Sequence, residues 1–124
     1  IVEGALSTDH DVAMIKKIRE NSKLILALGD CAITGNISAM KNLFGSDAVL
    51  QKGYFDLADI NESKKYPSKI VPKLLDKVLP LHEVVKIDYF LPGCPVPADA
   101  IYEMLKALIE GREINIHEFT RFGK

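Results

Sequence analysis

The two cysteines of the chain are the side chains best suited to chemistry. Cys31 follows the apolar run 24–28 and a Gly-Asp pair, and Cys94 follows the largely apolar stretch 87–91 and a Pro-Gly pair. Each cysteine therefore lies just beyond the end of a predicted buried strand. In an open α/β sheet the carboxyl ends of parallel strands share one edge, where ligands bind. We therefore expect the two thiols to lie near each other in the fold.

Several kinds of chemistry are compatible with such a pair. A cysteine in a protein interior often serves only as a small apolar filler, and disulfides are uncommon in the cytosol. A nucleophilic thiol needs a nearby base, and no histidine flanks either cysteine. Zinc or an iron–sulfur cluster needs about four ligands. A metal site therefore requires further ligands from another segment or from a partner.

The elements around the cysteines predict an α/β fold. Residues 1–4 resemble the end of a strand, and 24–28 is a buried strand. Between them a helix is predicted from Thr8 or Asp9 to about residue 21, because apolar side chains recur on one face. Strand, helix and strand form a βαβ unit, which requires parallel pairing and a right-handed crossover. A later helix is predicted over 98–110, ended by a glycine.

The secondary-structure signals in the rest of the chain are weaker. A loop is expected around Cys31, followed by a short helix over 36–44, and residues 46–68 are expected to form an irregular excursion. Apolar residues at helical spacing predict a helix over 67–81, and a strand is expected over 84–91. The tail 112–124 carries Phe119 and Phe122 among charges and is expected to lie along a partner.

Composition limits the class of protein. The chain has 124 residues, of which 48% are apolar and 27% charged, and its net charge is -1. These values predict a single globular domain, 1–124, and give no reason to expect binding to nucleic acid or to an anionic membrane. No apolar run reaches the roughly 20 residues of a membrane span, and two cysteines are too few for a secreted disulfide scaffold. A cytoplasmic protein is expected, with residues missing upstream because no initiator methionine is present.

Three motifs resemble the small subunit of nickel–iron hydrogenases, in particular the cytoplasmic, bidirectional, NAD-linked type. They are VEGA at 2–5, GDCAITGN at 29–36 and FLPGCP at 90–95, and they occur in the order and at the spacing of that family. The likeness extends through NISAMKNLF, VPKLL and LPLHEVV. It implies a flavodoxin-like parallel sheet with helices on both faces, incomplete at its amino terminus.

The resemblance also implies a cofactor and partners. Such subunits hold a four-iron, four-sulfur (4Fe-4S) cluster, which relays electrons between the nickel–iron large subunit and NAD(P)-linked diaphorase subunits that carry flavin and iron–sulfur clusters. Cys31 and Cys94 match the third and fourth cluster ligands. The family's C-x-x-C pair has no counterpart here, so two ligands are expected from a missing amino-terminal segment. The nickel–iron active site belongs to a partner, and no catalytic residue is expected in this chain.

The glycines and the acidic residue of these motifs are further candidates. Gly29 and Gly93 are expected to let backbone amides approach the cluster sulfurs, where hydrogen bonds tune the potential. Glu3, in the family's VEG element, is expected at the same edge of the sheet. There it either carries protons or positions the cluster, or it is a strand-end carboxylate that meets backbone amides.

Two alternatives stay open at this point. The cluster-bearing small subunit of a complex I-like NADH dehydrogenase shares the implied fold and cluster. A flavodoxin-like module that binds flavin at the same edge is a different class, although the hydroxyl-rich phosphate loop of flavodoxins is not seen in these residues.

Overall fold

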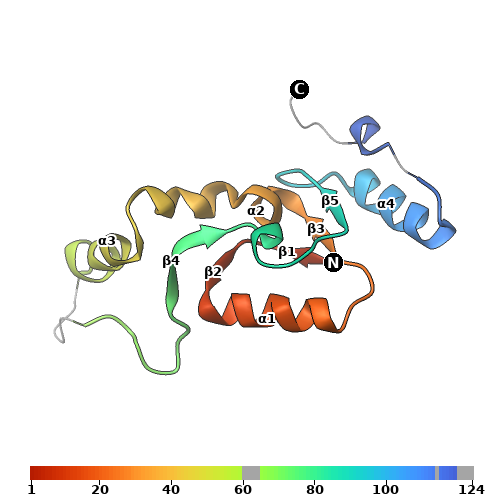
Figure 1. The fold of residues 1–124 in the computed structure, drawn as a ribbon. Helices are drawn as coiled ribbons and strands as arrows, with labels where there is room; N and C mark the ends of the chain where they lie inside the picture. The colour runs from red at the N-terminus through yellow and green to blue at the C-terminus, as the bar shows by residue number, and fades with distance from the viewer. Residues whose placement is uncertain (60–64, 114, 120–124) are drawn as a thin grey trace.

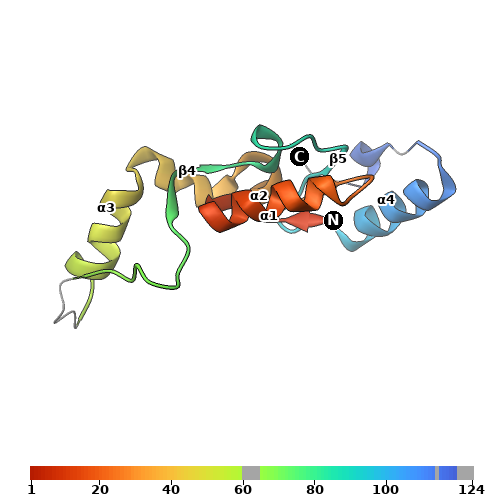
Figure 2. The same cartoon turned by 60° about the horizontal axis from the view of Figure 1, so that its bottom comes forward.

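The computed structural model describes residues 1–59, 65–113 and 115–119 (Figure 1). The molecule is elongated in both views, with α3 (Ser46–Gln51) at one end and α4 (Ala98–Glu110) at the other (Figures 1 and 2). No helix in the described ranges is long and apolar enough to cross a membrane.

A three-stranded parallel sheet forms the centre of the fold. Its strands are β1 (Val2–Glu3), β3 (Leu26–Leu28) and β5 (Tyr89–Leu91), in the order β1-β3-β5. Val2 is paired with Ala27, and Leu28 with Leu91. The helix α1 (Asp9–Glu20) lies between β1 and β3 in the chain, so the predicted βαβ unit is confirmed. Its parallel pairing brings the carboxyl ends of all three strands to one edge.

Helices cover both faces of this sheet. Consecutive residues of a strand point to opposite faces, and β3 shows this clearly. Ala27 packs in a buried cluster with Ile15 of α1, whereas Leu26 packs in a second cluster with Leu91 and with Met104 of α4. The α/β class and the arrangement of helices on both faces are therefore confirmed.

The helix boundaries follow local signals in the sequence. Thr8 caps α1: its hydroxyl accepts the backbone N–H of Asp11 at 3.2 Å, and the carboxylate of Asp11 accepts the N–H of Thr8 at 2.8 Å. This reciprocal capping box satisfies two donors that the first turn leaves without partners. At the other end of the chain, α4 stops at Gly111, which adopts the left-handed conformation that ends many helices (φ 67°).

The helix predicted over 67–81 is wrong, because this region contains the strand β4 (Leu74–Leu79). β4 pairs antiparallel with β2 (Leu6–Thr8), which lies far earlier in the chain: Leu6 is paired with Leu79 and Thr8 with Leu74. The side chain of Asn42 makes the two backbone hydrogen bonds that a neighbouring strand would make to β4. It accepts the N–H of Val78 at 2.7 Å and donates to the carbonyl of Val78 at 2.9 Å. The backbone of β4 therefore finds partners that helical spacing cannot reveal.

Three further expectations need correction. Cys31 lies in a short helix, α2 (Gly29–Thr34), which begins directly after β3 where a loop was expected. The expected irregular segment 46–68 begins with α3 and a π-helical turn, Lys52–Asp56. Val84 and Val85 lie outside β5, because their N–H groups donate to the carbonyl of Leu81. The short helix expected over 36–44 is present as a 3₁₀ helix, η1 (Asn36–Leu43).

Candidate metal centre

Cys31 and Cys94 line one cavity of about 440 Å³ at the carboxyl edge of the parallel sheet. Cys31 is delivered by α2 after β3, and Cys94 by the turn after β5. Because β3 and β5 are hydrogen-bonded neighbours, their carboxyl ends adjoin. Gly29, Gly93 and Glu3 line the same cavity. The structure therefore brings together all the residues that the sequence marked as candidates.

A pair of hydrogen bonds joins the two cysteine-bearing segments. The carboxylate oxygen Oδ1 of Asp30 accepts the N–H of Gly93 at 2.7 Å. In the reverse direction, the N–H of Asp30 donates to the carbonyl of Gly93 at 3.0 Å. We call these two bonds the Asp30–Gly93 bridge. Asp30 immediately precedes Cys31 and Gly93 immediately precedes Cys94, so the bridge ties the two cysteines together through their neighbours.

The backbone at Gly93 leaves no room for a side chain. Its φ of +150° lies where other residues rarely go, and a Cβ there would lie 2.7 Å from Cα of Val96 and 3.0 Å from the carbonyl oxygen of Pro95. Gly29 also has a positive φ of +82°, and its Cβ would lie 3.4 Å from the carbonyl oxygen of Gly93. Gly93 therefore permits the tight turn that carries Cys94, and the positive φ of Gly29 suits a glycine at the start of α2.

The two cysteines can supply two of the four thiolate ligands of an iron–sulfur cluster. Both cysteines are free thiols, Cys31 half-buried and Cys94 exposed, and thiolates are the usual ligands of such clusters. In the ranges that the structure describes, no group of three or more His, Cys, Asp and Glu residues could hold a metal ion. A four-thiolate site at this cavity therefore needs two more ligands besides the two cysteines of this sequence.

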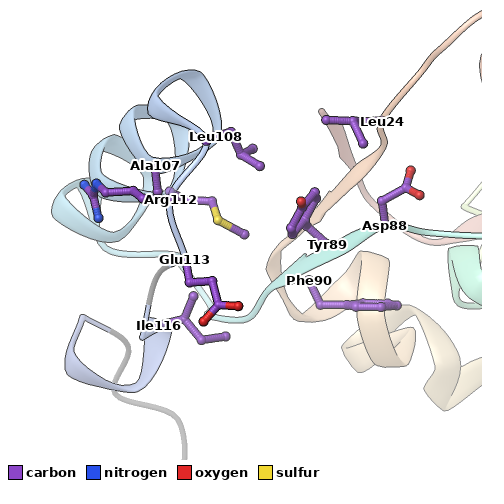
Figure 3. Close-up of a pocket in the computed structure, with 11 residues that line it drawn as sticks. Leu24, Asp88, Tyr89, Phe90, Ala107, Leu108, Arg112, Glu113 and Ile116 are labelled. Atoms are coloured by element: carbon purple, nitrogen blue, oxygen red, sulfur yellow. The ribbon is translucent and has the colours of Figure 1, made fainter.

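A larger cavity, about 610 Å³, lies at the opposite end of the strands. Ala107 and Leu108 of α4 form one wall, and Leu24, just before β3, and Tyr89 of β5 lie opposite them (Figure 3). Sequence reasoning did not anticipate this hollow, because it depends on the angle between α4 and the sheet. It contains no cysteine and is separate from the candidate metal centre.

Asp88, at the rim of this second cavity, ties β3 to β5 at their amino ends. Its carboxylate accepts a hydrogen bond from Arg19 at 2.6 Å and from the N–H of Ile25 at 2.8 Å. The Arg19 hydrogen bond, followed by the Ile25 N–H, lowers the pKa of Asp88 below its ordinary value. The β3–β5 pair is thus held by a carboxylate at each end, Asp30 and Asp88.

Sequence reasoning missed the role of Asp30. It placed this residue in the turn with Cys31 and assigned it no partner. The signal that was available is its position immediately before a candidate ligand. Its partner Gly93 is 63 positions away, and only the paired strands bring them together.

Comparison with known proteins places these features in a family. Residues 1–108 match the family described as NADH ubiquinone oxidoreductase, 20 Kd subunit. The delta subunit of the NAD-reducing hydrogenase HoxS of Cupriavidus necator is 36% identical over 120 residues, which are 93% of this chain and 56% of that protein. One subunit of the F420-non-reducing hydrogenase of Methanothermobacter marburgensis is 34% identical over 117 residues, 94% of this chain and 38% of that protein.

A solved structure agrees with the sequence relatives. A chain in the crystal structure of an NAD⁺-reducing [NiFe]-hydrogenase in the H₂-reduced state superposes with a TM-score of 0.92 at 30% identity. The match covers 98% of this chain and 70% of that one. The chain thus spans about two fifths to just over half the length of the two protein relatives named above, and its resemblance to hydrogenase small subunits is confirmed. With its parallel sheet, its paired cysteines and a match over residues 1–108, the chain belongs to the family of the NADH ubiquinone oxidoreductase 20 Kd subunit.

Proposed function

We propose that this chain is the electron-transfer small subunit of a nickel–iron hydrogenase, and that Cys31 and Cys94 are two of the four thiolate ligands of a 4Fe-4S cluster. The observation that carries the proposal is that both thiols line one cavity at the carboxyl edge of the sheet. When bound there, such a cluster supplies one-electron transfer. The other two ligands come from residues outside this sequence, which contains no further cysteine.

The residues of this chain have distinct tasks in that proposal. Cys31 and Cys94 supply two thiolates, and the Asp30–Gly93 bridge holds their backbones in register. Gly29 and Gly93 line the cavity and carry no side chain, so that backbone groups come close to the bound group. Glu3 places a carboxylate at the same cavity, where it contributes a negative charge or a proton-binding group.

The exposed surface supports an obligate partner. A compact monomer of 124 residues exposes about 6,600 Å², whereas this chain exposes 8875 Å². Obligate interfaces bury on the order of 2,000 Å² or more in total, so the excess is large enough for one. We propose the hydrogen-activating large subunit as this partner, and NAD(P)-linked diaphorase subunits as the electron acceptors. The complex then works in the cytoplasm, beside the NAD(P) pool.

An uncharged apolar stripe lies on η1, directly after the cysteine-bearing α2. A 3₁₀ helix has three residues per turn, so Ile37, Met40 and Leu43 align on one side. They are 71%, 63% and 79% exposed, and Phe44 beside them is 70% exposed. Interface cores are depleted in charge and enriched in Met and aromatic residues. The stripe therefore suits a protein partner better than a charged one such as nucleic acid.

Both buried clusters are built on β3, one on each face of the sheet. This shared strand supports treating residues 1–124 as a single domain. A respiratory NADH dehydrogenase subunit belongs to the same family. The hydrogenase assignment is favoured because the relatives at 34–36% identity described above are named as hydrogenase subunits.

The proposal is tested by Cys31→Ser and Cys94→Ser in the full-length protein with its partner subunits, with Ser38→Ala on η1 as the control. Each cysteine variant should lose cluster iron and sulfide and abolish hydrogen-driven NAD(P) reduction. Hydrogen–deuterium exchange at the partner's nickel–iron centre should persist, because hydrogen is split there. Full iron content and unchanged NAD(P) reduction in Cys31→Ser would refute the proposed function.

A further inference from the structure

The backbone of Gly93 is held on both sides by one residue. Asp30 receives the Gly93 N–H on its carboxylate at 2.7 Å and donates its own N–H to the Gly93 carbonyl at 3.0 Å. A hydrogen bond to a charged acceptor is stronger than one between neutral groups. The carboxylate half of the bridge depends on the side chain of Asp30, whereas any residue other than proline could supply the N–H half.

The bridge lies where the sheet itself no longer holds the chain. The last ladder pair between β3 and β5 is Leu28 with Leu91, and both cysteines come later in the chain. Beyond that pair, Asp30 and Gly93 continue the cross-strand contact at the positions directly before the two thiols. Beyond the sheet, this bridge therefore joins the two cysteine-bearing segments, while Gly93 packs tightly against Val96 within its own turn.

We propose that Asp30 is a positioning residue: its carboxylate, through Gly93, fixes Cys94 relative to Cys31 so that both thiolates are preorganised for one cluster. This inference rests on the proposed function, since it assigns a task toward the cluster. Preorganisation matters because a ligand pair that must first be ordered spends binding free energy on that ordering. Loss of the carboxylate therefore weakens cluster retention without removing a ligand.

The structure offers a matched control at the other end of the same strands. Asp88 also uses its carboxylate to accept a backbone N–H across the β3–β5 pair, from Ile25 at 2.8 Å. It lies at the amino ends of the strands, away from both cysteines. A variant of Asp88 therefore reports what the loss of a strand-tying carboxylate does to stability alone.

The test compares Asp30→Ala, Asp30→Asn and Asp88→Ala in the full-length protein. Exchange of the Gly93 amide is measured by NMR on the cluster-free protein, and the half-life of cluster iron in the presence of a chelator is measured on the loaded protein. In Asp30→Ala we expect Gly93 exchange to rise about tenfold, the effect of losing one hydrogen bond, and the iron half-life to shorten. Asp30→Asn keeps an acceptor oxygen but loses its charge, so it should fall between wild type and Asp30→Ala in both measurements.

Asp88→Ala should lower the midpoint of urea unfolding without shortening the iron half-life. If Asp30→Ala does not fold, Asp30→Glu takes its place, because it keeps the charge but moves the oxygens by one methylene. Wild-type Gly93 exchange and iron retention in Asp30→Ala, or in Asp30→Glu where it takes its place, would overturn the proposal. So would an equal loss of iron in Asp88→Ala, since the effect would then be one of global stability.

Different outcomes refute the proposed function and the positioning role of Asp30. If the wild-type protein holds no cluster, or if Cys31→Ser holds it as well as wild type does, the proposed function is refuted and the ligand-positioning role falls with it. Gly93 exchange still decides whether Asp30 joins the two segments. If the cysteine variants lose iron and Asp30→Ala (or its replacement Asp30→Glu) does not, only the positioning role is refuted.

Discussion

Replacing Gly93 with alanine should be among the most damaging small changes in the chain. The new Cβ would lie 2.7 Å from Cα of Val96 and 3.0 Å from both the nitrogen of Val96 and the carbonyl oxygen of Pro95. All three are backbone atoms, which cannot rotate away as the end of a flexible side chain can. The segment that carries Cys94 must therefore move as a whole.

Two effects contribute to the loss of stability in Gly93→Ala. A backbone conformation that suits only glycine costs a residue with a side chain about 1–3 kcal/mol, and an added methyl in a packed site costs about 1–3 kcal/mol. Gly93→Ala should therefore lower the free energy of unfolding by about 4 kcal/mol. Gly111→Ala is the matched control: Gly111 also has a positive φ, +67°, but a Cβ there meets nothing within 4 Å. It should cost only the conformational part, about 1–2 kcal/mol.

The assay is urea unfolding of both variants beside wild type, with the shift of the midpoint converted at constant slope. The amide of Asp30, which donates to the Gly93 carbonyl, reports the local displacement through its hydrogen exchange. Its exchange should rise in Gly93→Ala and stay at the wild-type rate in Gly111→Ala. Equal destabilisation by the two alanines would refute the reasoning, because the close backbone contact would then cost nothing.

Two further predictions concern the rest of the molecule. Because the Arg19 hydrogen bond lowers the pKa of Asp88, the ionised carboxylate contributes stability above about pH 4 that is lost as the pH falls through the lowered pKa. In urea unfolding, Asp88→Asn should therefore be less stable than wild type at pH 7 and equal to it near pH 2. A difference in stability that persists at pH 2 would contradict this pH dependence. On η1, Leu43→Glu should weaken association with the large subunit at least about tenfold, because it puts a charge into the apolar stripe. Because Leu43 is 79% exposed, the Leu43→Glu variant should change the chain's own stability by no more than about 0.5 kcal/mol. The control Ser38→Glu, on the same helix, should bind the large subunit normally. Unchanged binding by Leu43→Glu would exclude the stripe from the interface.

The local sequence determined the elements whose signals are complete within a few residues. Thr8 and Asp11 define the start of α1 through their capping box, and Gly111 defines the end of α4. The apolar run that contains β3 reads as a buried strand because its residues face a core on each side. Two parallel strands each followed by a cysteine were enough to predict that both cysteines lie at one edge of the sheet, because parallel pairing brings the carboxyl ends of the strands to the same edge.

Only the tertiary structure decided the elements that depend on distant partners. β4 is a strand because β2 and Asn42 offer hydrogen bonds to its backbone, and the spacing of its apolar residues suits a helix equally well. The Asp30–Gly93 bridge joins residues 63 positions apart, so neither residue reveals it alone. Of the two tail residues expected to lie along a partner, Phe119 packs against the chain's own buried cluster with Leu26 and Met104, and Phe122 lies outside the described residues. The physical reason is general: capping and glycine stops are local interactions within a few residues, whereas strand pairing and cross-strand hydrogen bonds are defined only once the chain has folded back on itself.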